Sequence, residues 1–254
     1  MAAKSDEYNN LISYETFEEV EDSGQKYIDS KWVIKEKEVQ DGSKHKVKAR
    51  IVAKGFQEET KPKSDAPTAM RESFKLVMNI VVQEEFEILA SIDIKAAFLN
   101  GKIERDVHIR PPKDLLKPGK LWKLNKLLYG MNDASRGFWK LVKNIFKDLG
   151  LIPVAGDEAF YQKRENGKLV ASVITHVDDF QIGSTKQFMD ELVQTLNSKL
   201  KISKIEHKQF RFTGIDVDYA KSLEYIEKFR NVPDSEELTL IEKILYRKRT
   251  GKLS

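Results

Sequence analysis

The chain has 254 residues, 40% of them hydrophobic and 33% charged, with a formal net charge of +4 and a pI of about 8.9. This length suits one large domain or two joined subdomains, and the weak positive charge permits nucleic-acid binding without requiring it. The absence of cysteine excludes disulfides and thiolate zinc sites. The sequence has neither a membrane-spanning apolar run nor a signal-peptide core, so an intracellular protein with no membrane partner is expected.

The first predicted elements are an acidic N-terminal extension and a β-hairpin. Residues 1–28 are expected to begin as a loose, solvated end, because acidic side chains dominate them. Residues 31–35 and 46–53 then predict two strands joined by an Asp-Gly turn. The second strand alternates apolar residues on one face with cations on the other, among them Lys48 and Arg50. Taken alone, this cationic row favours a solubility role over phosphate binding.

The middle of the chain predicts a helix and then a strand that carries a single acid. From Ser73 onward, apolar residues recur at helical spacing, which indicates a buried stripe. Residues 90–94 form a short apolar run with Asp93 near its centre. An unpaired carboxylate inside a strand would cost several kcal/mol, so a cation is expected beside it. A further short strand is predicted at 107–109.

Residues 172–183 predict a second hairpin with two acids at its turn. A β-branched run leads into Asp178 and Asp179, and another short apolar run leads out. Adjacent acids are good turn residues, and an isolated pair would favour that interpretation. Because Asp93 lies on a different strand, however, neighbouring strands can bring the carboxylates to one place. This combination predicts a divalent-metal site.

The order of the elements predicts an α+β fold with an antiparallel sheet covered by helices on one face. The other elements expected are a helix capped by Asp133 or Ser135 and ended by Gly150, a helix over 186–200 capped by Ser184, a strand over 210–217 and a final helix over 236–248.

Five segments resemble motifs of copia-type LTR-retrotransposon reverse transcriptases and occur in that family's order. They are Lys48–Gly55 (KARIVAKG), Ser91–Gly101 (SIDIKAAFLNG), Leu128–Gly130 (LYG), His176–Asp179 (HVDD) and Phe212–Ile215 (FTGI). The resemblance extends from about Phe17 to the C-terminus. It implies a right-hand polymerase with its thumb largely missing. The implied parts are fingers at 29–90 and about 102–128, a palm over 91–218, and a truncated thumb or connection at 219–254, after an N-terminal extension at 1–28.

The resemblance implies an RNA-directed DNA polymerase that adds dNTPs to a primer 3′-hydroxyl on an RNA or DNA template. Its implied cofactors are two Mg²⁺ ions, for which Mn²⁺ can substitute. Asp93, Asp178 and the backbone carbonyl of Ile94 would hold the metal, and Asp179 would be a secondary acid. In a full element, RNase H, integrase and Gag regions belong to the same polyprotein, which acts in a cytoplasmic virus-like particle.

The remaining implied site residues bind the nucleotide or the primer. Arg50 would bind triphosphate oxygens bidentately, and the ring of Phe98 would exclude a 2′-hydroxyl. The implied nucleotide-binding residues are Lys48, Arg50, Phe98, Tyr129 and Gly130. The implied primer contacts are His176 at the terminus and a grip formed by Phe212, Thr213, Gly214 and Ile215.

Two alternatives stay open at this point. His176 stands where the family usually has an aromatic residue before Val-Asp-Asp. Ala220 follows Tyr219 directly, whereas relatives continue through another strand at this point, and the sequence stops at Ser254. These departures favour a decayed or co-opted fragment that folds and binds nucleic acid without polymerising. Another palm-type nucleotidyl transferase or cyclase would share the strand-borne acids, but the hairpin with Arg50 argues against it.

Overall fold

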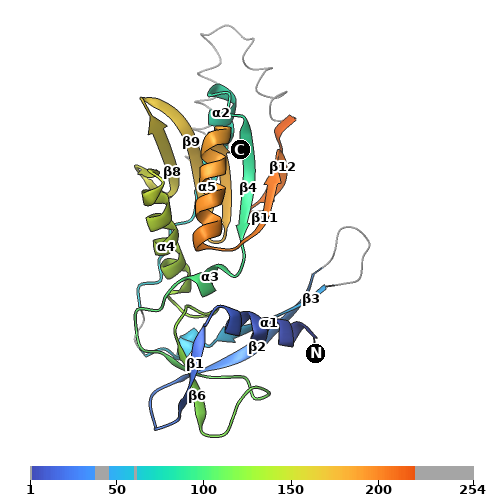
Figure 1. Ribbon diagram of the computed structural model, residues 1–254, viewed down its shortest axis with the longest axis vertical. Helices are drawn as coiled ribbons and strands as arrows, with labels where there is room; N and C mark the ends of the chain where they lie inside the picture. Colours follow the sequence, from blue (N-terminus) through green and yellow to red (C-terminus); the bar gives the residue numbers. More distant parts are fainter. Residues whose placement is uncertain (1, 38–45, 60–61, 221–254) are drawn as a thin grey trace, which may run out of the picture.

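The computed structural model describes residues 2–37, 46–59 and 62–220. Two sheets follow one another along the long axis of the molecule, a five-stranded sheet at one end and a six-stranded sheet at the other (Figure 1). The predicted α+β class is confirmed. No helix within these ranges is long and apolar enough to cross a membrane.

The five-stranded sheet has the order β1-β6-β5-β2-β3. Its strands are β1 (Phe17–Glu21), β2 (Ile28–Lys37), β3 (Lys46–Ala53), β5 (His108–Arg110) and β6 (Lys120–Leu124). β2 and β5 are parallel, whereas the other pairs are antiparallel. β3 therefore lies at an edge. Its predicted alternation holds from Ala49 to Ala53, where every second side chain is buried, while Val47 is exposed.

The expectation of a loose N-terminal end is wrong for the described part of residues 1–28. Helix α1 (Ala2–Ser13) packs across β3, and its Leu11 is fully buried. The ring of Tyr8 contacts the rings of Phe17 and Trp122, at 6.3 and 6.1 Å between centroids. Sequence reasoning missed the helix because its buried side has few apolar residues and its exposed side is mostly polar.

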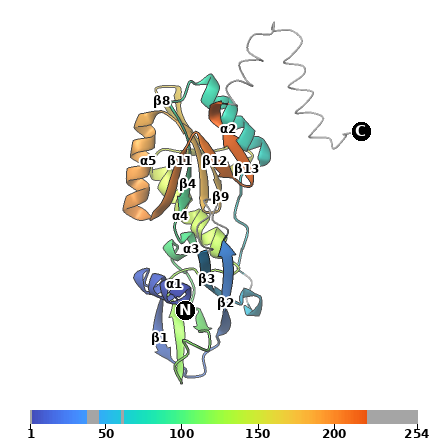
Figure 2. The same ribbon diagram turned by 90° about the vertical axis from the view of Figure 1, so that its right-hand side faces the viewer.

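The six-stranded sheet is antiparallel throughout and has the order β11-β4-β10-β9-β8-β7. Its strands are β4 (Ile88–Ile94), β7 (Ile152–Val154), β8 (Asp157–Glu165), β9 (Lys168–His176), β10 (Asp179–Ser184) and β11 (Ile202–His207). Helices α4 (Ala134–Asp148) and α5 (Lys186–Lys199) cover one face, and α2 (Arg71–Gln83) lies on the other (Figure 2).

Helices therefore lie on both faces of this sheet and not on one face alone, as the order of the elements had predicted, and strand alternation explains the three-layer packing. Successive side chains of β4 point to opposite faces, so Ala90 and Ile92 pack with α4 and α5 while Leu89 packs with α2. Gly183 on β10 leaves room for α2, because a Cβ there would lie 2.3 Å from a methyl carbon of Val81. The short helix η1 (Gly55–Gln57) follows β3 in the chain, and α3 (Ala97–Asn100) lies between the two sheets (Figure 1).

The predicted helix caps need correction. Thr185 rather than Ser184 caps α5, because its hydroxyl accepts a hydrogen bond from the Phe188 N–H at 3.3 Å. Asp133 occupies the N-cap position of α4 but makes no capping bond with its side chain. Its carboxylate instead accepts hydrogen bonds from Arg105 at 2.9 and 3.0 Å, so the ion pair replaces the cap.

The predicted strand over 210–217 is in fact a hairpin. Its strands are β12 (Gln209–Phe212) and β13 (Ile215–Asp218), and the residues between them have φ values of 48° and 83°. The glycine in this turn provides the positive φ that splits the apolar run into two strands. The predicted Asp41-Gly42 turn and the final helix over 236–248 lie outside the described residues.

Candidate active site

One row of residues crosses four strands of the six-stranded sheet. The strand registers pair His176 on β9 with Asp179 on β10, Asp179 with Asp93 on β4, and Asp93 with Lys204 on β11. Directly paired residues of an antiparallel sheet share a face, with Cβ atoms about 4.5–5.5 Å apart. Two of the three predicted acids therefore lie side by side although they are far apart in sequence.

The third acid lies in the turn between β9 and β10. Val177 adopts a φ of 57°, which is unusual for a β-branched residue, and Asp178 follows it. The backbone carbonyl of Asp178 accepts a hydrogen bond from the N–H of Ile94 at 3.0 Å. This bond holds the turn against the end of β4, so Asp178 stays next to the paired acids.

Burial and neighbouring negative charges raise the pKa values of Asp178 and Asp179. Burial, followed by the negative charges of Asp178 and Asp93, raises the pKa of Asp179 to about 6. Burial and then the Asp93 charge raise the pKa of Asp178, against the opposing attraction of Arg50 and Lys48. The site thus has excess negative charge, and a bound cation would relieve it.

The carboxylates fit a magnesium ion that is only partly held by protein. Within the described residues, no three side chains of His, Asp or Glu converge as a complete metal-binding group. A cation here would take two carboxylates from the chain and its other ligands from substrate and water. Mg²⁺ is commonly bound in this way, with one or two carboxylates plus phosphates and several waters.

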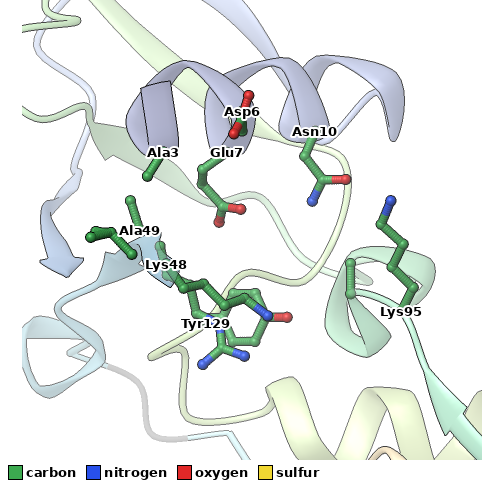
Figure 3. A pocket seen from close by; sticks show the side chains of 11 residues that line it. Ala3, Asp6, Glu7, Asn10, Lys48, Ala49, Lys95 and Tyr129 are labelled. Atoms are coloured by element: carbon green, nitrogen blue, oxygen red, sulfur yellow. The ribbon is translucent and has the colours of Figure 1, made fainter. Parts of the chain in front are cut away.

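A cavity of about 440 Å³ lies between α1 and β3 (Figure 3). The lining residues are Ala3, Asp6, Glu7, Asn10, Val47, Lys48, Ala49, Arg50, Lys95, Ala96 and Tyr129. The predicted nucleotide-binding residues Lys48, Arg50 and Tyr129 therefore share one cavity. The guanidinium of Arg50 lies over the Tyr129 ring at 4.8 Å from its centroid, and the Phe98 ring meets the Tyr129 ring edge-on at 5.0 Å.

Burial and charge keep the Tyr129 phenol neutral. Burial raises the pKa of Tyr129 to about 12, although the nearby Arg50 charge lowers it. The ring therefore presents a neutral aromatic face to the guanidinium, which suits stacking of a cation on a π-system. This contact holds Arg50 at one wall of the cavity.

Gly130 fixes the loop that carries Tyr129. Its φ is +85°, and a Cβ at this position would lie 2.2 Å from the carbonyl oxygen of Ala53. The loop runs along the end of β3, where the Tyr129 carbonyl accepts from the Ala53 N–H at 2.7 Å and the Gly130 carbonyl accepts from the Gly55 N–H at 3.2 Å. Only glycine fits this close contact between the two backbones. The contact fixes the position of the loop relative to β3, the strand that carries Arg50.

The predicted primer contacts lie in two different places. Phe212 is 1% exposed and stacks on Phe74 at 5.9 Å between centroids, so its side chain is part of the core. The turn residues Thr213 and Gly214 are exposed and remain accessible to a ligand. His176 lies in the row of acids, and its Nδ1 is buried with no hydrogen-bond partner among the described residues.

Sequence reasoning missed the contribution of α1 to the cavity. Figure 3 shows the Glu7 carboxylate extending from α1 toward Lys48 and Tyr129. The available signal was the spacing of Glu7 and Leu11, which places them on the same side of a helix. An acidic residue on the buried side of a helix is unusual and indicates a role beyond packing.

The six-stranded sheet carries paired acids on its central strands, and the five-stranded sheet has a cationic edge strand. Together these features define a polymerase-like class of α+β protein. The sequence model of a family described as reverse transcriptase (RNA-dependent DNA polymerase) matches residues 14–230. This match covers most of the chain, so the chain belongs to the reverse transcriptase family. It is a copia-type reverse transcriptase domain, as the names of its relatives also indicate.

Those relatives are long transposon polyproteins. The retrovirus-related Pol polyprotein from transposon RE1 of Arabidopsis thaliana is 26% identical over 198 residues, which are 74% of this chain and 13% of that protein. The corresponding polyprotein from transposon TNT 1-94 of Nicotiana tabacum is 28% identical over 189 residues, 72% of this chain and 14% of that protein. The Ty1-MR1 Gag-Pol polyprotein of Saccharomyces cerevisiae is 24% identical over 229 residues, 85% of this chain and 13% of that protein. The chain thus spans about one-seventh of their length.

Among solved structures, a foamy viral protease-reverse transcriptase in complex with double-stranded DNA is similar to this chain. The superposition has a TM-score of 0.47 and 11% sequence identity, and it covers 85% of this chain and 33% of the viral one.

Proposed function

We propose that this domain is an RNA-directed DNA polymerase that extends a primer 3′-hydroxyl with dNTPs by two-metal nucleotidyl transfer. The observation that carries the proposal is the register that pairs Asp93 with Asp179, with Asp178 bonded through its backbone to Ile94 beside them. Family membership gives the reaction class, and this cluster supplies the acids that the class requires.

Asp93 and Asp178, with the backbone carbonyl of Ile94, would hold Mg²⁺, and Mn²⁺ could replace it. A bound ion would supply a Lewis acid that activates the hydroxyl and stabilises charge on the phosphates. Asp179 would act as the secondary acid near the primer, and His176 would contact the primer terminus. Both lie in the same row as Asp93.

The cationic wall of the cavity, formed by Lys48 and Arg50 on β3, would bind the triphosphate. Arg50 can donate two parallel hydrogen bonds to phosphate oxygens, and its stacking on Tyr129 fixes the plane of the guanidinium. Lys48 adds a second positive charge on the same strand. Phe98 would limit the space beside the sugar, since Tyr129 supports its ring from one side. Gly130 sets the position of this loop.

The domain would use these parts within a larger protein. We assign fingers to 29–90 and about 102–128, palm to 91–218, and the start of a thumb or connection to 219–254. Residues 1–28 form an N-terminal extension, and the grip would be the turn around Thr213. The partners would be a primed RNA or DNA template and, in a full element, RNase H, integrase and Gag regions inside cytoplasmic virus-like particles.

Primer extension on an RNA template tests the proposal. The assay uses a DNA primer, dNTPs and Mg²⁺ or Mn²⁺, with Asp178→Asn as the inactive variant. Asp190→Asn is the matched control, because it makes the same change on the exposed face of α5. Extension by the wild type and the control, but not by Asp178→Asn, is the expected result.

A folded wild-type protein that binds the primed duplex and extends nothing would contradict the proposal. The decayed or co-opted fragment would then be the better description. Circular dichroism and a binding titration on the same preparation separate that outcome from simple misfolding.

A further inference from the structure

The α1 wall of the cavity contains a buried carboxylate oxygen without a partner. Glu7 is 8% exposed, and among the described residues its Oε1 has no hydrogen-bond partner. The carboxylate is otherwise hydrogen-bonded by the backbone N–H of Ile51 and by the side chain of Asn10. One oxygen therefore has a structural role on the edge of β3, and the other is left for something in the cavity.

The opposite wall of the cavity contains a buried hydrogen-bond donor without a partner among the described residues. This donor is Nε of Arg50. Arg50 and Lys48 both attract the Glu7 carboxylate electrostatically, yet Oε1 of Glu7 and Nε of Arg50 each lack a hydrogen-bond partner within the described ranges. The cavity thus separates an unpaired acceptor from an unpaired donor. Leaving either one unsatisfied costs free energy.

A ligand that satisfies both walls must carry an anionic acceptor and a hydroxyl donor. Phosphate oxygens satisfy Arg50 and Lys48, but they cannot donate to Glu7 and are repelled by its charge. Inorganic pyrophosphate is therefore a poor fit. A nucleoside triphosphate is a better one, because its sugar adds an O–H group. In a deoxynucleotide paired with a template, the 3′-hydroxyl is the O–H donor of the sugar.

We propose that Glu7 accepts a hydrogen bond from the 3′-hydroxyl of the incoming deoxynucleotide and so selects it over dideoxynucleotides and free pyrophosphate. This inference rests on the proposed nucleotide-binding function. It makes Glu7 of α1 a specificity-determining residue, outside all five motifs. The anchoring of α1 by Leu11 and by the 2.7 Å Lys4–Asp114 ion pair keeps the carboxylate in place.

Glu7→Gln is the informative variant because it separates the two roles of the side chain. The single amide oxygen can still accept from the Ile51 N–H, while the NH₂ group turns toward the cavity and cannot accept a hydroxyl proton. Asp6→Asn is the matched control. It removes the same charge from the same cavity lining and the same helix, but Asp6 is exposed, and Figure 3 shows its carboxylate directed away from Lys48 and Tyr129.

The experiment measures equilibrium binding of dTTP, ddTTP and pyrophosphate in Mg²⁺, with a dideoxy-terminated primer on its template so that no bond can form. Wild type and Asp6→Asn are expected to bind dTTP about 10-fold more tightly than ddTTP, the effect of one charge-assisted hydrogen bond. Glu7→Gln is expected to bring that ratio close to unity and to bind pyrophosphate more tightly.

Three results would overturn the inference. In the first, the wild type binds dTTP and ddTTP equally, which leaves the polymerase proposal standing. In the second, Glu7→Gln weakens both nucleotides alike, which would show that Glu7 contacts a feature that dTTP and ddTTP share and not the 3′-hydroxyl. In the third, Asp6→Asn acts like Glu7→Gln, which would indicate general electrostatics. Failure of the polymerase proposal looks different, because the wild type would then neither bind dTTP nor extend a normal primer.

Discussion

The acidic row and the cationic wall are positioned by different parts of the fold. Asp93 and Asp179 lie on β4 and β10, interior strands with a hydrogen-bonded neighbour on each side. Arg50 lies on β3, an edge strand whose outer side is closed by the Tyr129 carbonyl and the Glu7 carboxylate. The acids are therefore fixed by strand register, whereas the cations depend on a loop and a helix from elsewhere in the chain.

This difference predicts two kinds of mutational behaviour. Changes in the acidic row should alter chemistry while the sheet remains intact, because paired strands hold their register without those side chains. Changes in the loop and the helix that position the cationic wall should alter stability and nucleotide binding together, because few contacts hold that wall in place. The following predictions test this contrast.

The largest expected effect is loss of activity in Asp93→Asn. The substitution removes a charge that would hold the metal, and metal assistance contributes several kcal/mol to the transition state. We expect kcat for primer extension to fall about 1,000-fold, which corresponds to about 4 kcal/mol. Single-turnover extension measures the loss, and urea denaturation should show a stability no lower than that of the wild type. A strongly destabilised Asp93→Asn protein would contradict the view that register alone fixes this row.

Gly130→Ala should have the next largest effect, and on both properties. A Cβ would meet the Ala53 carbonyl at 2.2 Å, and the φ of +85° disfavours any other residue. We expect a loss of about 3 kcal/mol in the free energy of unfolding, with a raised KM for dNTP. Urea denaturation and steady-state kinetics measure the two.

Gly183→Ala is the comparison variant in the other region. Its new Cβ would meet a methyl of Val81 at 2.3 Å, a side-chain rather than a backbone contact, on the face of the sheet that packs on α2. We expect a smaller loss of about 1–2 kcal/mol and an unchanged KM. Equal effects of the two glycine variants on KM would remove the distinction between the regions.

The same contrast explains what the sequence could predict. The hairpin with Asp178 at its turn and the strand with Asp93 were predictable, because short apolar runs and local turn chemistry define them. Their pairing followed once the two strands were placed in one sheet. The structure confirms these elements as β4, β9 and β10. The residues' catalytic roles stay predictions.

The missed parts are those that depend on distant contacts. Helix α1 has one fully buried apolar side chain, Leu11, so its sequence contains no periodic apolar stripe that would predict a helix. Strand β6 was missed because its pairing partners, β1 and β5, come from separate parts of the chain. Thr185 and Ser184 are both good capping residues, and only the backbone geometry distinguishes them. Glu7 was overlooked for the same reason as its helix.

Arg50→Lys is expected to have an intermediate effect, confined to nucleotide binding. Lysine keeps the charge but loses the planar fork and much of the stacking on Tyr129. We expect KM for dNTP to rise about 10-fold, or about 1.4 kcal/mol, with little change in kcat. The control is Lys31→Arg, the reverse exchange of the two cations at an exposed site on β2. A fall in kcat without a change in KM would place Arg50 outside the phosphate site.

The smallest expected effect is the contribution of Asp179 to the pH dependence of the free energy of unfolding. Its folded pKa of about 6 lies above the usual value for an aspartate. The folded state therefore holds this proton more tightly than the unfolded state, a contribution that is fully present below about pH 4 and is lost as pH rises through about 6. Two pKa units correspond to at most about 3 kcal/mol, and partial solvation reduces this to about 1 kcal/mol.

Asp179→Asn should accordingly be about 1 kcal/mol more stable than the wild type at about pH 8 without metal, and equal to it near pH 4. Thermal or urea denaturation across this range measures the difference, and the surface variant Asp190→Asn should show no such pH dependence. Added Mg²⁺ should narrow the gap, because binding to the folded wild type stabilises it by mass action. If Asp179→Asn is less stable than the wild type at about pH 8, the acidic row does not carry the excess negative charge that a metal would relieve.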